Sequence, residues 1–446
     1  MGTRTMTWRQ ASARRLARSG LATPLTPAGS TDTGSAGAAG RHAGGGAADV
    51  APAPGSPVTG GHAADASAPV APAPGAPAAP HDVPAGTPAA VLCTLCGAQA
   101  QVLSAAELSV GMRLAGATRA DVRRALWDDR TVVKTFGPRG TIHLLAAADL
   151  PLWTGALGAL PGGSGNGGGT LGLLTPDQAD AVVAAAADAL ADAELTVDEL
   201  TDAIAERAGS WAADPVMEAF QTKWPRWRAA TALAAHRGAL CFGPNRGRKV
   251  TYTSPQRWLP GFAPAAPDDA LAALVRRYLY AYGPATPQDF ARWLAAPAAW
   301  ARDLFAARAQ ADEIEPVELA GVPSWVVAGD VAAPAEEARG VRLLPYFDAY
   351  AIACRPRELL FPGRAYERAL AGGQAGNFPV LLVDGEVAGV WHQRRSGRRI
   401  AVTVEPLDRL PAARRRALGV EVERLGEIME GRVELTVGRV DVGPHA

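Results

Sequence analysis

The chain has 446 residues with 44 basic and 44 acidic side chains, so its formal net charge is zero. This balance excludes a strongly basic protein that coats nucleic acid, and any nucleic-acid binding has to come from local patches. The length suits two to four domains. No run of about 18 apolar residues is present, and the basic N-terminus lacks the apolar segment of a secretory signal. We therefore expect a cytoplasmic protein that does not span a membrane.

The low use of cysteine fits a reducing cytoplasm, because only four cysteines are present. Cys93 and Cys96 form a C-x-x-C pair, but no second pair and no nearby histidine follows, so a zinc site is poorly supported. On a helix the two thiols would face the same side and pack as small hydrophobic groups. We expect no metal and no other cofactor.

The first expected element is a basic amphipathic helix over residues 8–19, stopped by Gly20. We assign this segment, residues 1–21, to a first winged-helix unit. Residues 22–86 are rich in Ala, Pro and Gly, with few aromatic side chains. Such a composition cannot bury enough apolar surface to offset the entropy lost on ordering, so a disordered insertion is expected.

Order resumes with a helix that begins after Thr87, a candidate N-cap, and ends at Gly97. The next helix is expected to start at Ser104, where Glu107 three residues later would complete a capping box. Residues 99–102 would then form a short connector between the two helices.

Two glutamines stand two residues apart in this connector. In an extended chain alternate side chains point the same way, so Gln99 and Gln101 can converge on one ligand while Ala100 faces the other side. Glutamine does not titrate, so the pair is not a conventional acid/base couple. Two amides can still orient water, a base or a phosphate. The alternative is that both merely hydrogen-bond the exposed ends of the neighbouring helices.

The pattern that follows is helix, strand, tight turn and strand. Thr118 caps a helix in "RADVRRALWDD", and a hairpin made of "TVVKTF", "GPRG" and "TIHLL" comes next. This is the outline of a winged helix, which is a helix-turn-helix variant with a β-hairpin wing. We assign it to residues 87–170, which end in a flexible glycine-rich loop at residues 161–169.

The outline recurs twice. Residues 171–262 are expected to form a second winged helix, with strands around "GALCFG" and "VTYTS" and helices at 176–192, 197–208 and 225–236. A third copy is assigned to residues 263–335, with strands near Val317 and Trp325 and helices at 268–282, 287–294 and 298–309.

Residues 336–446 alternate like antiparallel strands separated by glycine turns, with a helix at 412–429 before a last strand. This texture indicates a small β-barrel or antiparallel sheet domain. The expected fold class is therefore α+β, with tandem winged helices and a C-terminal β-barrel.

Basic side chains gather at several turns, where they would meet DNA phosphates or be merely solvated. Two arginines in the second unit open an expected helix, whose dipole also favours an anion. His143 would be either an exposed strand residue or a phosphate contact. The candidate DNA-contacting residues are Arg139 and His143 in the first unit, Arg226, Arg228, Arg246, Arg248 and Lys249 in the second, and Arg394, Arg395, Arg398 and Arg399 at a C-terminal hairpin.

Three stretches resemble one known family: "CGAQAQVLSAAELSVGMRL", "VVKTFGPRGTIHLLAAADLPLW" and "LLPYFDAYAIACRPRELLFP". They are similar to the winged-helix DNA-binding family that contains the AlkZ-like (YcaQ-like) DNA glycosylases. The resemblance covers most of the chain from about residue 87, together with the first helix. It implies tandem winged helices scaffolded by a β-barrel around a basic DNA channel, and it implies that Gln99, Ala100 and Gln101 are a Gln-aliphatic-Gln catalytic motif.

The implied chemistry is physically sensible for alkylated purines. N7 alkylation leaves a positive charge on the base, which departs without a general acid, so the enzyme has to position water and stabilise an oxocarbenium-like sugar. Gln101 would hold the water through its amide oxygen, and Gln99 would contact the sugar or the water's partner. The motif contains no lysine, so we expect a monofunctional glycosylase without lyase activity, acting as a monomer on damaged double-stranded DNA.

Two other readings compete with a glycosylase. Winged helices most often serve non-catalytic DNA-binding proteins such as transcriptional regulators, and that reading predicts sequence-specific binding that is indifferent to the glutamines. A protein-interaction scaffold with degenerate wings would show no salt-sensitive affinity for DNA.

Overall fold

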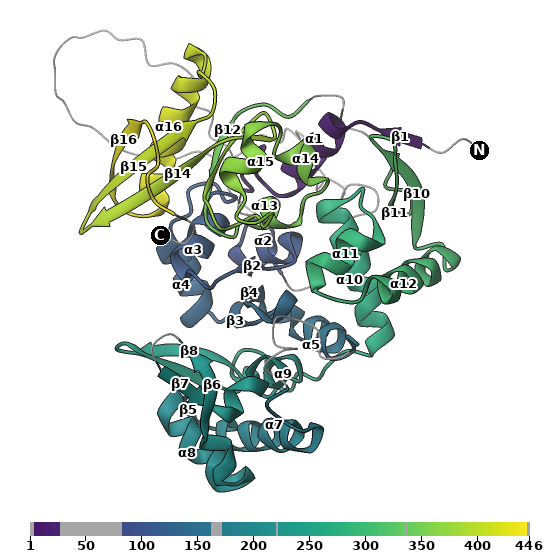
Figure 1. Cartoon of the computed structure of the whole chain (residues 1–446), viewed down its shortest axis with the longest axis vertical. Helices are drawn as coiled ribbons and strands as arrows, with labels where there is room; N and C mark the ends of the chain where they lie inside the picture. Colours follow the sequence, from purple (N-terminus) through teal and green to yellow (C-terminus); the bar gives the residue numbers. More distant parts are fainter. Residues whose placement is uncertain are drawn as a thin grey trace, which may run out of the picture.

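The computed structural model describes residues 4–26, 83–161, 172–219, 222–332, 334 and 337–443. Most of the insertion and nearly all of the glycine-rich loop expected from the sequence lie outside these residues. Helices and sheets are interspersed along the chain, which confirms the α+β class. In Figure 1 the segment from α7 to β9 lies at the bottom, and the other elements form the larger upper part.

The first unit carries the two glutamines. Its sheet has the order β2-β4-β3 and is antiparallel throughout. Short 3₁₀ helices at Pro138–Gly140 and Ala147–Asp149 flank β4. The longer elements are α2 (Pro88–Leu95), β2 (Ala98–Gln99), α3 (Leu103–Gly111), α4 (Arg119–Trp127), β3 (Val132–Phe136), β4 (Ile142–Ala146) and α5 (Leu150–Gly158).

Helix starts in this unit show both a confirmed and a wrong prediction. Thr87 accepts a hydrogen bond from Ala90 and begins α2, and Thr118 begins α4, both as expected; Thr118 also forms a capping box with Asp121. The capping box expected at Ser104 is wrong, because α3 starts one residue earlier without any side-chain cap. Glu107 is instead fully buried and pairs with Arg123 at 2.5 Å.

The second unit repeats the same sheet order, β5-β9-β8, and has its own apolar core around the fully buried Trp227. Short 3₁₀ helices occupy Ser210–Ala213, Arg226–Ala230 and Pro255–Arg257. The other elements are α7 (Pro176–Leu190), β5 (Glu194–Thr196), α8 (Val197–Ala208), β6 (Pro215–Ala219), β7 (Thr222–Pro225), α9 (Thr231–His236), β8 (Cys241–Arg246) and β9 (Lys249–Thr253).

The helix expected at 225–236 is wrong in its first half. Pro225 is the last residue of β7, which pairs with β6 in a separate two-stranded hairpin. The chain then forms one 3₁₀ stretch before the six-residue α9. No local pattern indicated this hairpin, because it is short and its strands are exposed or half-buried.

The third unit consists of three helices and a hairpin: α10 (Pro267–Tyr282), α11 (Pro287–Leu294), α12 (Ala298–Gln310), β10 (Ile314–Leu319) and β11 (Val322–Val327). The N-terminal segment joins this unit, since β1 (Arg4–Met6) pairs in parallel with β10. Helix α1 (Trp8–Arg18) follows, and its arginines Arg14 and Arg18 pair with Asp330. The expected assignment of residues 1–21 to the first unit therefore needs correcting.

The C-terminal region forms a curled five-stranded sheet of order β12-β13-β14-β15-β16. It has two edges, so it is a half-barrel, and its β15–β16 pair is parallel whereas the others are antiparallel. The elements are β12 (Val341–Leu344), α13 (Ala349–Ala353), α14 (Arg357–Leu360), α15 (Arg364–Ala369), β13 (Val380–Val383), β14 (Glu386–Ser396), β15 (Arg399–Pro406), α16 (Ala412–Ile428) and β16 (Arg432–Val437).

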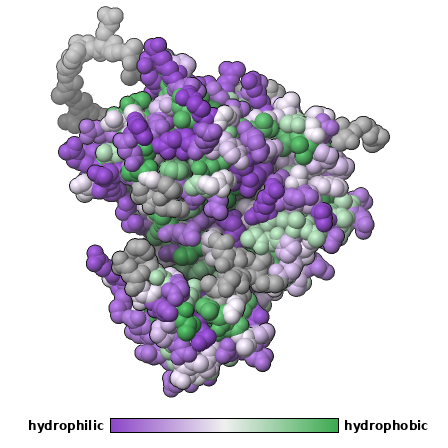
Figure 2. Space-filling view, viewed as in Figure 1, coloured by the Kyte–Doolittle hydropathy of each residue, from purple (hydrophilic) through white to green (hydrophobic). Residues whose placement is uncertain are grey.

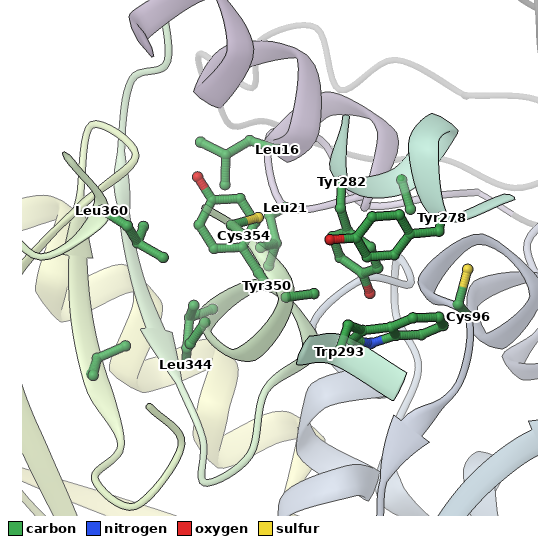
Figure 3. Close-up of a cluster of buried hydrophobic side chains, with 14 of the residues drawn as sticks. Leu16, Leu21, Cys96, Tyr278, Tyr282, Trp293, Leu344, Tyr350, Cys354 and Leu360 are labelled. Carbon is green, nitrogen blue, oxygen red and sulfur yellow. The ribbon is translucent and has the colours of Figure 1, made fainter. Parts of the chain in front are cut away.

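One apolar core joins the first unit, the third unit and the C-terminal sheet. Figure 3 shows side chains from all three regions in this core, among them Cys96, Tyr282 and Tyr350. A buried ion pair between Arg113 and Asp348, with 2.9 Å between nitrogen and oxygen, adds a polar link between the first unit and the C-terminal region. The glutamine motif is therefore attached to a core shared by three regions rather than to an isolated small domain.

Candidate active site

The two glutamines lie on either side of the residue that anchors their connector. The Ala100 nitrogen donates to the Ile142 carbonyl at 2.7 Å, and the Ala100 side chain is only 1% exposed. Gln99 lies opposite His143 in the β2–β4 ladder and is buried, whereas Gln101 is exposed. As alternation predicts, the two amide groups meet: the Gln99 Nε2 donates to the Gln101 Oε1.

Arg139 fixes the direction of this hydrogen bond. Its Nη2 donates to the Gln99 Oε1 at 2.8 Å. Because a guanidinium group can only donate, the Gln99 oxygen faces Arg139 and its NH₂ group faces Gln101. The Gln101 oxygen thus accepts one bond from within the protein and keeps a second lone pair, together with its own NH₂ group, for a ligand.

Gln101 lines a cleft between the first and second units with a volume of about 780 Å³. One wall comes from the first hairpin, and the opposite wall comes from α8, β7 and β9. Figure 2 shows the surface recessed where the lower unit meets the upper part of the molecule. Besides Gln101, the lining includes Phe136, Asp202, Trp224, Arg228 and Tyr252. A cleft of this size, with aromatic walls and a few polar groups, suits a nucleotide.

His143 is not at the surface, which corrects the expectation that it touches solvent or phosphate. It is 4% exposed, and its Nδ1 lies 2.8 Å from the Thr141 carbonyl oxygen. Burial, together with the charge on Arg139, lowers the pKa of His143 to about 3. The ring is therefore neutral and donates from Nδ1, and it packs beneath the glutamine motif rather than binding an anion.

Arg139 also has its terminal nitrogens engaged within the protein. Nη2 bonds Gln99, and Nη1 donates to the Trp293 carbonyl oxygen at 2.8 Å. The side chain is partly buried, and desolvation lowers its pKa to about 10, so it stays charged near neutral pH. This geometry argues against the phosphate contact expected from the sequence.

The wing-tip cluster of the second unit is partly neutralised. Arg246 pairs with Glu199 at 3.0 Å, and Lys249 pairs with Asp198 at 2.8 Å, both at the start of α8. Arg248 is exposed and has no ion-pair partner in the described part of the chain. The structure thus brings the three charges to one turn, as expected, but leaves only one of them free.

Arg226 and Arg228 precede α9 rather than opening it. Arg226 donates to the Leu173 carbonyl and pairs with Asp214 at 3.4 Å. The guanidinium of Arg228 lies 3.8 Å from the centroid of the Trp224 ring. Trp224 lines the Gln101 cleft and is 37% exposed, and sequence reasoning did not single it out. Its only signal was an aromatic residue set among basic ones in "KWPRWR".

The four C-terminal arginines lie around the tight β14–β15 turn, as predicted. Arg395 donates to the Met429 carbonyl, and Arg399 pairs with Glu434 at 3.1 Å. Arg394 and Arg398 are exposed, and neither has an ion pair among residues 337–443. These two are the free charges of the hairpin.

The described residues hold no cluster of three or more His, Cys, Asp or Glu side chains that could bind a metal. Cys93 and Cys96 are free thiols at the end of α2, and burial raises the pKa of both. Both thiols pack among apolar side chains, as expected, but not on one helix face: Cys96 lies just beyond α2 with φ of 53°, and the two contact different apolar cores. None of the described helices is long and apolar enough to cross a bilayer.

Comparisons with known proteins all point to one family. The family model described as "DNA glycosylase AlkZ-like" matches residues 92–428. An interstrand DNA cross-link repair glycosylase from Streptomyces sahachiroi is 32% identical over 328 residues, which are 67% of this chain and 80% of that protein. The solved Streptomyces sahachiroi DNA glycosylase AlkZ superposes with a TM-score of 0.68 at 26% identity, covering 97% of this chain and all of the other.

The match spans most of the chain and includes both glutamines, the first hairpin and the first four strands of the C-terminal sheet. DNA glycosylases hydrolyse N-glycosidic bonds, so the reading as an enzyme of DNA repair is favoured over a non-catalytic regulator. The chain belongs to the AlkZ-like family of DNA glycosylases.

Proposed function

We propose that this protein excises N-alkylated purines from duplex DNA as a monofunctional glycosylase, with Gln101 positioning the attacking water. The observation that carries the proposal is the orientation of the Gln101 amide. Its oxygen is held by Gln99 from one side, and the residue itself opens onto the cleft between the first two units. An amide fixed in this way can order a water molecule without undergoing any change of protonation.

The proposed chemistry asks little of the protein beyond orientation and electrostatics. A purine alkylated at N7 is cationic and leaves as a neutral base, so no acid is needed to protonate it. The water donates a hydrogen bond to the free lone pair of the Gln101 oxygen and attacks C1′ of the sugar as the C1′–N9 bond breaks, and its proton passes to solvent. The carboxylate of Asp202, in the same cleft, would favour the positive charge that develops on the sugar.

We expect no lyase activity. A lyase needs a neutral amine, yet Lys249 pairs with Asp198, which raises its pKa. The other lysine of the cleft, Lys223, pairs with Glu218 at 3.2 Å. We expect no covalent complex with DNA when the reaction is run in borohydride, which traps a Schiff base.

We further propose that the three helix-and-hairpin units are winged helices that hold the duplex as a monomer in the cytoplasm. The shared sheet order of the first two units and the hairpin at the end of the third support this. Phosphates would meet Arg228, Arg248, Arg394 and Arg398, four candidate residues that have no ion pair in the described part of the chain.

Cross-linked purines are a second substrate class that we propose. The related Streptomyces sahachiroi protein is named for the repair of interstrand cross-links. The cleft beside Gln101 is open rather than a closed base pocket, and its volume of about 780 Å³ leaves room for a bulky adduct. A bulky adduct would therefore not be excluded by shape.

The test incubates the protein with duplex DNA that carries a single 7-methylguanine and then cleaves abasic sites with alkali. Strand breaks are expected with the wild type and are expected to be lost with Gln101→Ala, while binding to the duplex is retained. A second duplex with one interstrand cross-link tests the wider substrate range. Salt-sensitive binding without breaks on either duplex would contradict the proposal.

A further inference from the structure

We propose that Arg139 is a positioning residue for excision. By two donated hydrogen bonds it ties the amide of Gln99, and through Gln99 that of Gln101, to the C-terminal end of α11. This inference rests on the catalytic role proposed above for Gln101. Arg139 thus orients the glutamine amides, whereas its position on a wing turn had suggested a phosphate contact.

The first support is the group at the far end of the link. The Trp293 carbonyl lies in the last turn of α11, where carbonyls lack intrahelical partners. The residue four positions further on is Pro297, which has no N–H to donate. The Arg139 Nη1 supplies the missing donor at 2.8 Å. Arg139 therefore completes the end of α11, and this end in turn holds the guanidinium.

The second support is the charge. Arg139 has no ion-pair partner in the described part of the chain, although desolvation disfavours its charged form. The negative end of the α11 dipole is the favourable environment that remains for it. A cation held in this way has a fixed place, because the guanidinium plane is bonded at both terminal nitrogens.

The third support is the backbone. Arg139 has φ of 63°, in the left-handed region that favours glycine, within the turn Pro138–Gly140. A side chain at such a position costs conformational energy that a glycine would not. The two bonds made by Arg139 are the compensating gain that the structure shows. They also bring the turn against α11, which belongs to a different unit.

The consequence for the site is that Arg139 fixes the orientation of both glutamine amide groups. Without Arg139 the Gln99 amide can turn over, placing its oxygen beside the Gln101 oxygen, where the two repel. Gln101 then loses its donor and swings into the cleft. With Arg139 present only one orientation is compatible with all three groups, and the free lone pair of Gln101 faces the water site.

Arg130 provides a matched control. It is an arginine of the same unit with a left-handed backbone, φ 53°, and its Nη1 donates to the Arg257 carbonyl at 3.1 Å. It has no hydrogen bond to either glutamine. Arg130→Met therefore removes a similar side chain from a similar backbone without touching the proposed link.

The experiment measures single-turnover excision of 7-methylguanine with enzyme in excess, and separately the Kd for the undamaged duplex. Arg139→Met is expected to lower the maximal rate about 100-fold, as for a site group displaced by about an ångström, with Kd unchanged. Arg139→Lys is expected to recover part of the rate, because an ammonium reaches one partner but not both. Arg130→Met is expected to match the wild type.

Two glutamine variants test the direction of the link and do not depend on how well Arg139→Met folds. Gln99→Glu keeps an acceptor for Arg139 but removes the donor to Gln101, so its rate is expected to fall as far as that of Arg139→Met. Gln101→Glu keeps the acceptor that Gln99 needs and is expected to fall less. Arg139→Met combined with Gln99→Ala is expected to be no slower than the slower single variant, because both break one link.

The outcomes separate this inference from the proposed function. Wild-type rates in Arg139→Met or Gln99→Glu would overturn the positioning role, as would losses that multiply in the double variant. Excision that is absent from the wild type, or unchanged in Gln101→Ala, would overturn the proposed function instead. If thermal melting shows that Arg139→Met does not fold, Arg139→Lys and the two glutamate variants decide the question.

Discussion

The first and second units share one sheet design and use it differently. Each has a short first strand hydrogen-bonded to the last strand of a hairpin, in the orders β2-β4-β3 and β5-β9-β8. Each short strand leads into a helix. In the second unit Thr196 and Glu199 form a capping box at that junction. In the first unit the junction has no side-chain cap, and Gln99 and Gln101 bond each other instead.

The two hairpin turns differ in the same way. The tip of the second hairpin is exposed, and its Arg246 reaches back to the capping residue Glu199. The tip of the first hairpin lies against α11, and its Arg139 reaches back to Gln99. An arginine thus contacts the strand-to-helix junction in both units. Where the junction is capped its polar groups are used by the cap, and where the cap is missing they are left for the role that we propose for Gln101.

The difference between the two junctions is tested by changing each junction separately. Gln101→Ala is expected to lower excision by about 10²- to 10³-fold, as for the loss of one group that orders charge in a site, with stability little changed. Thr196→Ala is expected to do the reverse, costing about 1 kcal/mol of stability while excision stays normal. Excision assays and thermal melts on both variants check this crossover. A loss of excision in Thr196→Ala would contradict it.

Glycine-to-alanine substitutions at the two hairpin turns should also differ in their effects on stability and on excision. A Cβ on Gly137 would lie 2.8 Å from the Cγ of His143, so Gly137→Ala must displace the ring that lies opposite Gln99. We expect a cost of about 1–3 kcal/mol together with reduced excision. Gly247 has open space but φ of 62°, so Gly247→Ala is expected to cost only about 1 kcal/mol, from the backbone, and to spare excision. Chemical denaturation measures both.

The first sheet, unlike the second, should make the stability of the protein depend on pH, because it contains the buried His143. The pKa of His143 is lowered from 6.5 to about 3, so the folded state binds fewer protons than the unfolded state between these values. Stability is therefore lost as the pH falls below about 6.5, by about 2 kcal/mol at pH 5 from this residue alone. The matching residue of the second sheet is Thr251, opposite Thr196. His143→Thr is expected to flatten the difference in unfolding free energy between pH 7 and pH 5.

The smallest expected effect concerns the exposed wing. Arg248→Ala is expected to weaken duplex binding uniformly and to reduce the slope of log K against log salt by about 1, because one phosphate contact is lost. Arg246→Ala is expected to change the slope less, since Arg246 is already paired with Glu199. Binding titrations at several salt concentrations compare the two. Equal slopes for both variants would place Arg246 on the DNA as well.

Elements with strong local signals could be predicted from the sequence. The helix bounds Val197–Ala208 and Pro287–Leu294 were predicted correctly, because each has a capping threonine immediately before its first residue. The convergence of Gln99 and Gln101 followed from alternation in an extended connector. In these cases neighbouring residues contain all the information that the structure uses.

The rest depended on partners far away in the sequence. Pairing of β1 with β10 requires residues from opposite parts of the chain, and nothing in "RTM" indicates it. From the sequence, Arg139 is expected to be a solvated turn residue. The fold brings it beside the Trp293 carbonyl, which has no donor from Pro297. From the sequence, His143 can be a surface strand residue, but packing of the first hairpin buries it. Tertiary contacts decide each of these outcomes, and local patterns do not record them.

The pairing of β1 with β10 also has a consequence for the order of events during synthesis. Strand β1 leaves the ribosome before the first and second units, yet its partner emerges only after both have been made. The anchor of Arg139 on α11 also emerges after both units. Nascent chains that end before the third unit would carry the complete glutamine motif but neither its anchor nor the docked N-terminus. The site geometry that we propose is therefore complete only late in synthesis, after α11 and β10 have been made.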